Sequence, residues 1–149
     1  MKRYITFASL AFVLLQGSMA QTIVKPSVKT KTTFAIVTDT KSYEEAKEEI
    51  DAYRASVEQE GLGSYLVIDD WKTPQPIREV LQTLHEDKKS PLEGCVLVGD
   101  IPVPMIRDAQ HLCSAFKMNQ TMAWQRSSVP SDRYYDDFGL KFDYIKQDS

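Results

Sequence analysis

Three short apolar runs lie between residues 33 and 98 of the chain. They cover residues 33–38, 65–68 and 95–98 and are rich in β-branched and aromatic side chains. None alternates regularly with polar residues, which is typical of strands that are covered on both faces of a parallel sheet. The pattern therefore predicts three buried, parallel strands.

Amphipathic stretches separate these runs. Ser42 followed three residues later by Glu45 matches a capping box, which opens a helix. Thr73 before Pro74 matches a helix start with proline in the first turn. Apolar residues then recur every three or four positions along both stretches, which are Tyr43, Ala46, Ile50, Tyr53 and Val57 in the first and Ile77, Val80, Leu81 and Leu84 in the second. The order strand, helix, strand, helix, strand predicts an α/β fold, a three-layer sandwich around a mainly parallel sheet.

Each predicted strand is followed by acidic residues, namely Asp39, Asp69 with Asp70, and Asp100. The ends of parallel strands share one edge of a sheet, where α/β proteins place their sites. Converging carboxylates can hold a divalent metal or support phosphoryl transfer, but Asp also favours turns and helix caps. We favour turns and caps. The segment TDTKSYEE after the first strand has no glycine, so a phosphate-binding loop is not predicted there.

The first twenty residues have the features of a signal peptide. Lys2 and Arg3 precede an uncharged apolar stretch over residues 5–15, and Ser18 and Ala20 supply small residues at a cleavage site. The apolar stretch is shorter than the ~20 residues that span a bilayer. We expect residues 1–20 to be removed, 21–32 to form a linker and 33–149 to form the α/β domain. The mature chain is expected to be exported to the periplasm, cell surface or extracellular space, without a membrane span.

Charge and cysteine content refine this picture. The 149 residues suit one domain. Residues 21–149 contain 16 Lys and Arg against 21 Asp and Glu, a net charge of −5, which argues against nucleic acid as a partner. Cys95 and Cys113 would be able to form a disulfide in an exported protein. A buried free thiol is the favoured interpretation for each, because Cys packs as a small hydrophobe.

Several segments together resemble the gingipain family of secreted cysteine peptidases. They are TFAIVTD, YLVIDDW and VLVGDIPVP, followed by VPSDRYYDD at residues 129–137. Leu97-Val98-Gly99-Asp100 is similar to a strand end of that family, and residues 131–135 are similar to its Ser-Asp-x-x-Tyr segment. The resemblance covers about residues 33–138. It implies a caspase-like α/β sandwich with VLVGD as a central strand, a following segment that wraps the sheet edge, and cleavage of a protein or peptide substrate.

The same resemblance accounts for the sequence GCVLVGDIPVP. Gly99 allows the chain to turn without a Cβ clash, and the Asp100 side chain is expected to bind backbone amides in that turn. Pro102 and Pro104 are expected to keep the exit extended.

The chain departs from the family beyond residue 137. Family members carry a catalytic His and then a catalytic Cys at the ends of later strands, whereas this sequence continues as FGLKFDYIKQDS. Within the chain, His111 and Cys113 are two positions apart on a predicted helix and cannot face each other. His85 is interpreted as a packed or solvated surface residue. The chain is therefore expected to be an incomplete, Rossmann-like half-fold, the amino-terminal portion of a peptidase that is not catalytic alone. The alternative is a secreted, non-catalytic α/β binding or interaction module.

An acidic cluster falls within the Ser-Asp-x-x-Tyr segment. Asp132, Asp136 and Asp137 are candidate calcium ligands, because the family is known to bind calcium. Their spacing lacks the alternating acid pattern of a preformed calcium loop, which favours a solvated acidic turn. No other cofactor is expected. The neighbouring aromatic residues are interpreted as filling a core or covering a sheet edge, with a ligand-stacking surface as the alternative.

Overall fold

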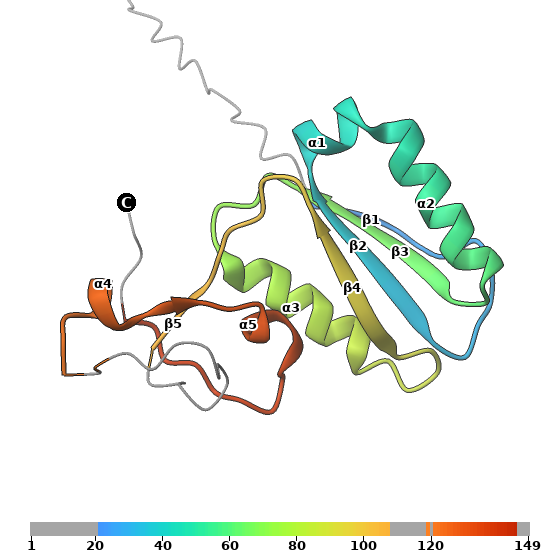
Figure 1. Ribbon diagram of the computed structural model, residues 1–149. Coiled ribbons are helices and arrows are strands. Elements are labelled where there is room, and N and C mark those ends of the chain that lie inside the picture. Colours follow the sequence, from blue (N-terminus) through green and yellow to red (C-terminus); the bar gives the residue numbers. More distant parts are fainter. Residues whose placement is uncertain (1–20, 108–118, 120, 146–149) are drawn as a thin grey trace, which may run out of the picture.

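The computed structural model describes residues 21–107, 119 and 121–145 (Figure 1). The predicted signal peptide, His111 and Cys113 lie outside these residues. The elements in chain order are β1 (Thr22–Val24), β2 (Thr33–Asp39), α1 (Thr40–Glu45), α2 (Lys47–Gln59), β3 (Gly63–Asp69), α3 (Pro74–His85), β4 (Leu92–Val98), β5 (Met105–Ile106), α4 (Trp124–Ser127), β6 (Val129–Pro130) and α5 (Arg133–Asp136).

The main sheet has four strands in the order β1-β3-β2-β4. The central strand β2 is parallel to β3 on one side and to β4 on the other. β1 is antiparallel to β3 and forms one end of the sheet. The predicted α/β class and the mainly parallel sheet are therefore confirmed.

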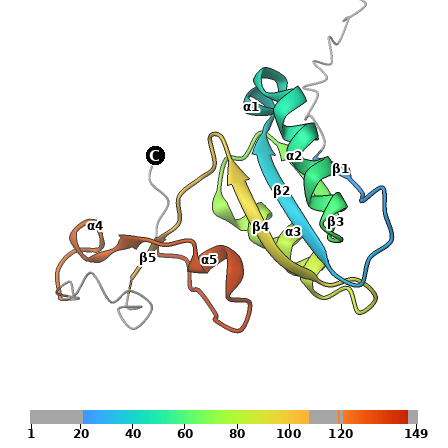
Figure 2. The same ribbon diagram turned by 45° about the vertical axis from the view of Figure 1, so that its right-hand side comes forward.

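Helices cover the sheet on both faces, with α1 and α2 on one side and α3 on the other (Figures 1 and 2). Ile36 and Leu66 point toward α2 and pack with its buried Ile50. Ala35, Val37 and Val67 point the other way, into a cluster that contains the α3 residues Ile77, Val80 and Leu81. Successive residues of β2 thus serve opposite cores, which is why its sequence is apolar throughout.

The segment 21–32, which we expected to be a linker, contributes β1 to the sheet. Two residues of α2 hold it in place. The main-chain N–H of Ser27 donates to Glu58 Oε1 at 2.9 Å, and the Arg54 guanidinium donates to the carbonyl oxygen of Lys25. Arg54 and Glu58 are themselves 3.6 Å apart as an ion pair. This segment is therefore a part of the domain.

The first helical stretch is two helices, because the chain breaks at Ala46 between α1 and α2. The residue that caps α1 is Asp39, whose side chain accepts a hydrogen bond from the main-chain nitrogen of Ser42. The capping box expected at Ser42 was therefore wrong by one turn. Pro74 does open α3, as the sequence indicated.

The segment that follows β4 packs beside α3. Arg78 of α3 lies against the rings of Tyr134, Phe138 and Phe142, with its guanidinium carbon 5.1–5.3 Å from each ring centroid. Its nitrogens donate to the carbonyl oxygens of Tyr134, Asp137 and Leu140. Tyr135 is buried in the α3 core cluster. Most of the aromatic residues of this segment are therefore structural, as the sequence indicated.

Candidate functional site

The acidic strand ends meet at the carboxyl edge of the sheet, as predicted. Asp39 and Asp69 are register partners at the ends of β2 and β3. Gly99 and Asp100 directly follow β4, on the other side of β2. The chain leaves β2 through α1 and α2 on one face of the sheet and reaches β4 through α3 on the other face. The ends of the neighbouring strands β2 and β4 therefore lie where α/β folds usually form a crevice.

The carboxylate of Asp39 lies between the ends of β2 and β4 and accepts hydrogen bonds from both sides. Its Oδ1 accepts from the Ser42 main-chain N–H at 2.9 Å, and its Oδ2 accepts from the Asp100 main-chain N–H at 2.7 Å. The residue is only 8% exposed. One carboxylate therefore caps α1 and fixes the turn after β4.

Gly99 is required by this arrangement. Its φ is +90°, and a Cβ built on it would lie 2.0 Å from Asp39 Oδ2 and 2.2 Å from Ser42 Oγ. The expectation that the Asp100 carboxylate binds the turn amides was wrong. The carboxylate is that of Asp39, and Asp100 contributes its main-chain N–H.

The electrostatics of Asp39 match a structural role. Burial raises the pKa of its carboxyl, but hydrogen bonds from the Ser42 hydroxyl, the Ser42 amide and the Asp100 amide outweigh burial and lower the pKa overall. The group is therefore ionised at neutral pH, with both oxygens engaged by the chain's own donors. This supports the turn-and-cap interpretation of the strand-end acids over metal binding or phosphoryl transfer.

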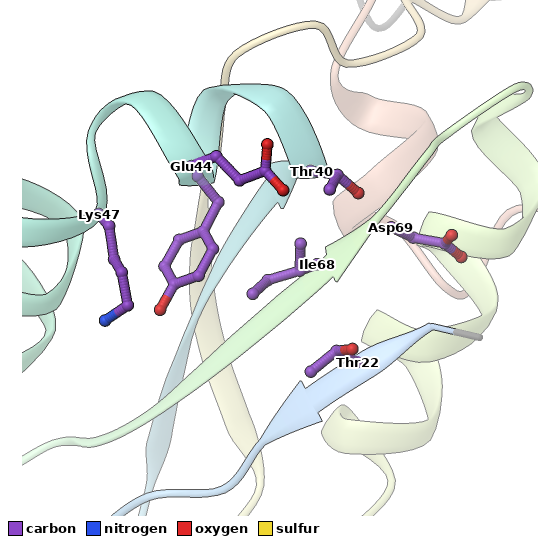
Figure 3. Close-up of a pocket in the computed structure, with 7 residues that line it drawn as sticks. Thr22, Thr40, Glu44, Lys47, Ile68 and Asp69 are labelled. Carbon is purple, nitrogen blue, oxygen red and sulfur yellow. The ribbon is translucent and has the colours of Figure 1, made fainter. Parts of the chain in front are cut away.

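Next to this turn lies an open pocket of about 390 Å³ (Figure 3). It is bounded by α1, the start of α2, the start of β1 and the end of β3. Its lining residues are Thr22, Thr40, Tyr43, Glu44, Lys47, Ile68 and Asp69. The pocket thus combines hydroxyls and two carboxylates with an apolar contribution from Ile68.

Lys47 supplies the positive charge at this pocket, but it is engaged elsewhere. It pairs with Asp51 and lies 5.5 Å from the centroid of the Tyr43 ring. The hydrogen bond to Asp51 is the main reason that the pKa of Lys47 is raised. Glu44 and Asp69 therefore dominate the local field, which suits a polar or cationic group.

The described candidates for catalysis do not form an activated pair. His85 Nδ1 lies 2.9 Å from the Leu92 carbonyl oxygen, and its ring packs on Phe138 at 5.2 Å. Cys95 is a half-buried free thiol. Burial, followed by the nearby Asp136 and Asp132 carboxylates, raises its pKa to about 11. A thiol with this pKa is a poor nucleophile at neutral pH.

Two of the three candidate calcium ligands have local partners for their carboxylates. Asp136 pairs with Arg133 at 3.3 Å, and Asp137 Oδ1 accepts from the Gly139 main-chain N–H at 3.2 Å. The Asp132 carbonyl oxygen accepts from the Tyr135 N–H. Within the described ranges no group of three acidic, His or Cys side chains is placed to hold a metal. Calcium binding here stays a prediction.

Two important side chains were missed from the sequence. Arg78 follows Ile77 on an amphipathic helix, and its sequence position gave no sign of a structural role. Trp71 follows an acidic pair, yet it is buried and its Nε1 donates to the Thr38 carbonyl oxygen at 2.9 Å. Both bind main-chain oxygens far away in the sequence, and no local pattern signals such contacts.

The fold and this edge define a mainly parallel α/β domain whose central strand end is fixed by a buried carboxylate. Comparison with known proteins found no matching family model, curated protein or solved structure. Across residues 21–107 and 121–145, no helix is long and apolar enough to cross a membrane.

Proposed function

We propose that this chain is the amino-terminal portion of a secreted, gingipain-like cysteine endopeptidase with a caspase-like fold. In this role the described residues supply the sheet and its helical layers, and a catalytic His and Cys come from chain beyond Ser149. The substrate is a protein or peptide. The sequence resemblance motivates this proposal, and the geometry of β4 supports it best.

β4 has a pairing partner on one side. Within the described residues the sheet ends at this strand, which pairs with β2 alone. Its residues Cys95, Val96, Leu97 and Val98 are apolar yet only half-buried. An apolar parallel strand is normally covered on both faces, and an open edge invites a further strand. The open edge supports the family expectation that VLVGD becomes a central strand.

On the face of the sheet that carries α2, the helical layer leaves β4 only partly covered. α2 covers β2 and β3, where Ile50 packs with Ile36 and Leu66. Phe34, Val96 and Val98 belong to that cluster but are only partly buried. Figure 2 shows α2 lying over the β3 side of the sheet. A further strand followed by a helix would cover these three side chains.

The test is to express the chain fused to the coding sequence that follows it, beside residues 1–149 alone. Both exported products are assayed against arginine- and lysine-containing peptides. We expect hydrolysis by the extended protein only, abolished by Ala at a cysteine of the added segment. The Cys95→Ala variant is the control and should retain activity. Loss of activity in Cys95→Ala, or hydrolysis by the shorter chain, would contradict the proposal.

The pocket at the carboxyl edge supports a second candidate, a secreted, non-catalytic binding or interaction module. Its hydroxyls and the carboxylates of Glu44 and Asp69 suit a polar or cationic ligand. A stop codon directly after Ser149, together with binding of such a ligand by residues 1–149, would favour this module over the peptidase.

A further inference from the structure

β1 lies between two pockets. Thr22 lines the pocket described above, while Gln21 and Ile23 line a second pocket of about 360 Å³ beside α3. This alternation follows from the two-residue period of an extended strand. Asp69, the last residue of β3, borders both pockets. The second pocket also contains Glu79 of α3.

Gln21 is the residue that signal-peptide cleavage after Ala20 would place at the new amino terminus. Before cleavage its main-chain nitrogen is an uncharged amide. After cleavage it becomes an amine with an ordinary pKa of about 7.7–8.0, and is mostly protonated at neutral pH. Cleavage would therefore add a positive charge to a residue that already lines a pocket with two carboxylates.

We infer that the second pocket binds the α-ammonium of Gln21 in the processed chain. Asp69 Oδ1 accepts from the Asp70 N–H and Glu79 Oε1 accepts from Gln75 Nε2, so in the described hydrogen bonds Oδ2 and Oε2 are left for the ammonium. Leader removal then strengthens the docking of β1 on β3. The inference rests on the predicted cleavage and is independent of the proposed peptidase activity.

The short length of β1 makes this charge important. The strand has three residues, all exposed, and three register pairs with β3. An arm with so little buried surface gains little from packing. An ion pair at Gln21, directly before this strand, would therefore add to the pairing of β1 with β3.

The pocket would also protect Gln21 from a chemical modification. An unprotonated N-terminal glutamine cyclises when its α-nitrogen attacks Cδ of its own side-chain amide. The N–Cδ bond forms, the Cδ–Nε2 bond breaks, and Nε2 leaves as ammonia after proton transfer from the attacking nitrogen. No oxidant or co-reactant is needed. Because an ammonium has no free lone pair, an ion pair that keeps the nitrogen protonated slows this reaction.

The rate of ammonia loss from Gln21 tests the inference. The exported protein is purified as wild type, Asp69→Asn, Glu79→Gln and Asp70→Asn, and followed by intact mass at neutral pH. Asp70 is the matched control, because it is exposed, adjacent to Asp69 and outside the lining of either pocket. We expect Asp69→Asn and Glu79→Gln to cyclise about two- to fivefold faster than wild type, the effect of one exposed ion pair. Asp70→Asn should match wild type.

High salt separates this electrostatic role from a purely structural one. The difference between wild type and Asp69→Asn should shrink at about 1 M salt, where charges are screened within ~3 Å. Equal rates in all four proteins, an effect of Asp70→Asn as large as that of Asp69→Asn, or a difference that salt leaves unchanged would overturn the inference. An exported protein that retains residues 1–20 would overturn it as well. None of these results depends on peptide hydrolysis.

Discussion

The carboxylate of Asp39 accepts a hydrogen bond from the main-chain N–H of Asp100 at 2.7 Å, across 61 positions of the sequence. The same carboxylate accepts from the Ser42 N–H at 2.9 Å. Asp39 thus joins the end of β2, the start of α1 and the turn after β4. The carboxyl edge of the sheet depends on this one buried side chain.

Replacing Asp39 by Asn should therefore destabilise the domain. The amide can still accept at the α1 cap, where Asn and Asp are about equally good. Its NH₂ group, however, would face the Asp100 N–H, donor against donor. We expect a loss of about 1–3 kcal/mol in the free energy of unfolding, measured by urea denaturation. Asp100→Asn is the matched control and should stay within about 0.5 kcal/mol of wild type. Equal losses in the two variants would contradict the assigned roles.

Asp39 also predicts a pH dependence. Its folded-state pKa lies below the ordinary value of 3.8. A depressed carboxyl pKa contributes stability that is present above the unfolded-state pKa and is lost as the pH falls through the folded-state pKa. The stability difference between wild type and Asp39→Asn should therefore be constant near neutral pH and shrink below about pH 4. A difference that persists unchanged to pH 2 would show that the ionised carboxylate is not the stabilising form.

Two glycines allow the clash at the β4 turn to be measured separately from backbone strain. Gly61 and Gly99 both have positive φ, +93° and +90°. A Cβ at Gly61 meets nothing within 4 Å, whereas a Cβ at Gly99 meets Asp39 and Ser42. Gly61→Ala should cost about 1–2 kcal/mol, the strain of a left-handed residue. Gly99→Ala should cost at least about 1 kcal/mol more. Equal costs in urea denaturation would contradict the close packing of Gly99 on Asp39.

The contacts of Arg78 indicate that it holds the segment after β4 against α3. Lysine keeps the charge but cannot stack as a plane and donate to three carbonyl oxygens together. Arg78→Lys should lower the free energy of unfolding by about 2–3 kcal/mol. It should also speed amide hydrogen exchange over residues 133–142. Arg133→Lys, which alters an exposed pair with Asp136, should have little effect. Unchanged exchange in Arg78→Lys would mean that the aromatic contacts alone hold this segment.

The sequence predicted the elements of the core better than the contacts between them. The apolar runs identified β2, β3 and β4, and Pro74 identified the start of α3, because these signals are local. β1 was missed because its three residues are exposed and carry no burial pattern. The capping-box pattern pointed to Ser42, whereas Asp39 was assigned only a general role in a turn or cap. Only the approach of Asp100 in three dimensions explains why Asp39 takes that position and why Gly99 must follow β4.

We propose that the open edge of β4 receives the remaining strands of a peptidase domain. Hydrogen exchange of the main-chain amides of Leu92–Val98 tests it most directly, with residues 1–149 compared to the protein extended by its following coding sequence. We expect the amides that face away from β2 to exchange at least about tenfold more slowly in the extended protein, because a new strand would bind them. The amides of Thr22–Val24, at the opposite end of the sheet, should be unchanged. Equal exchange along β4 in both proteins would contradict the claim.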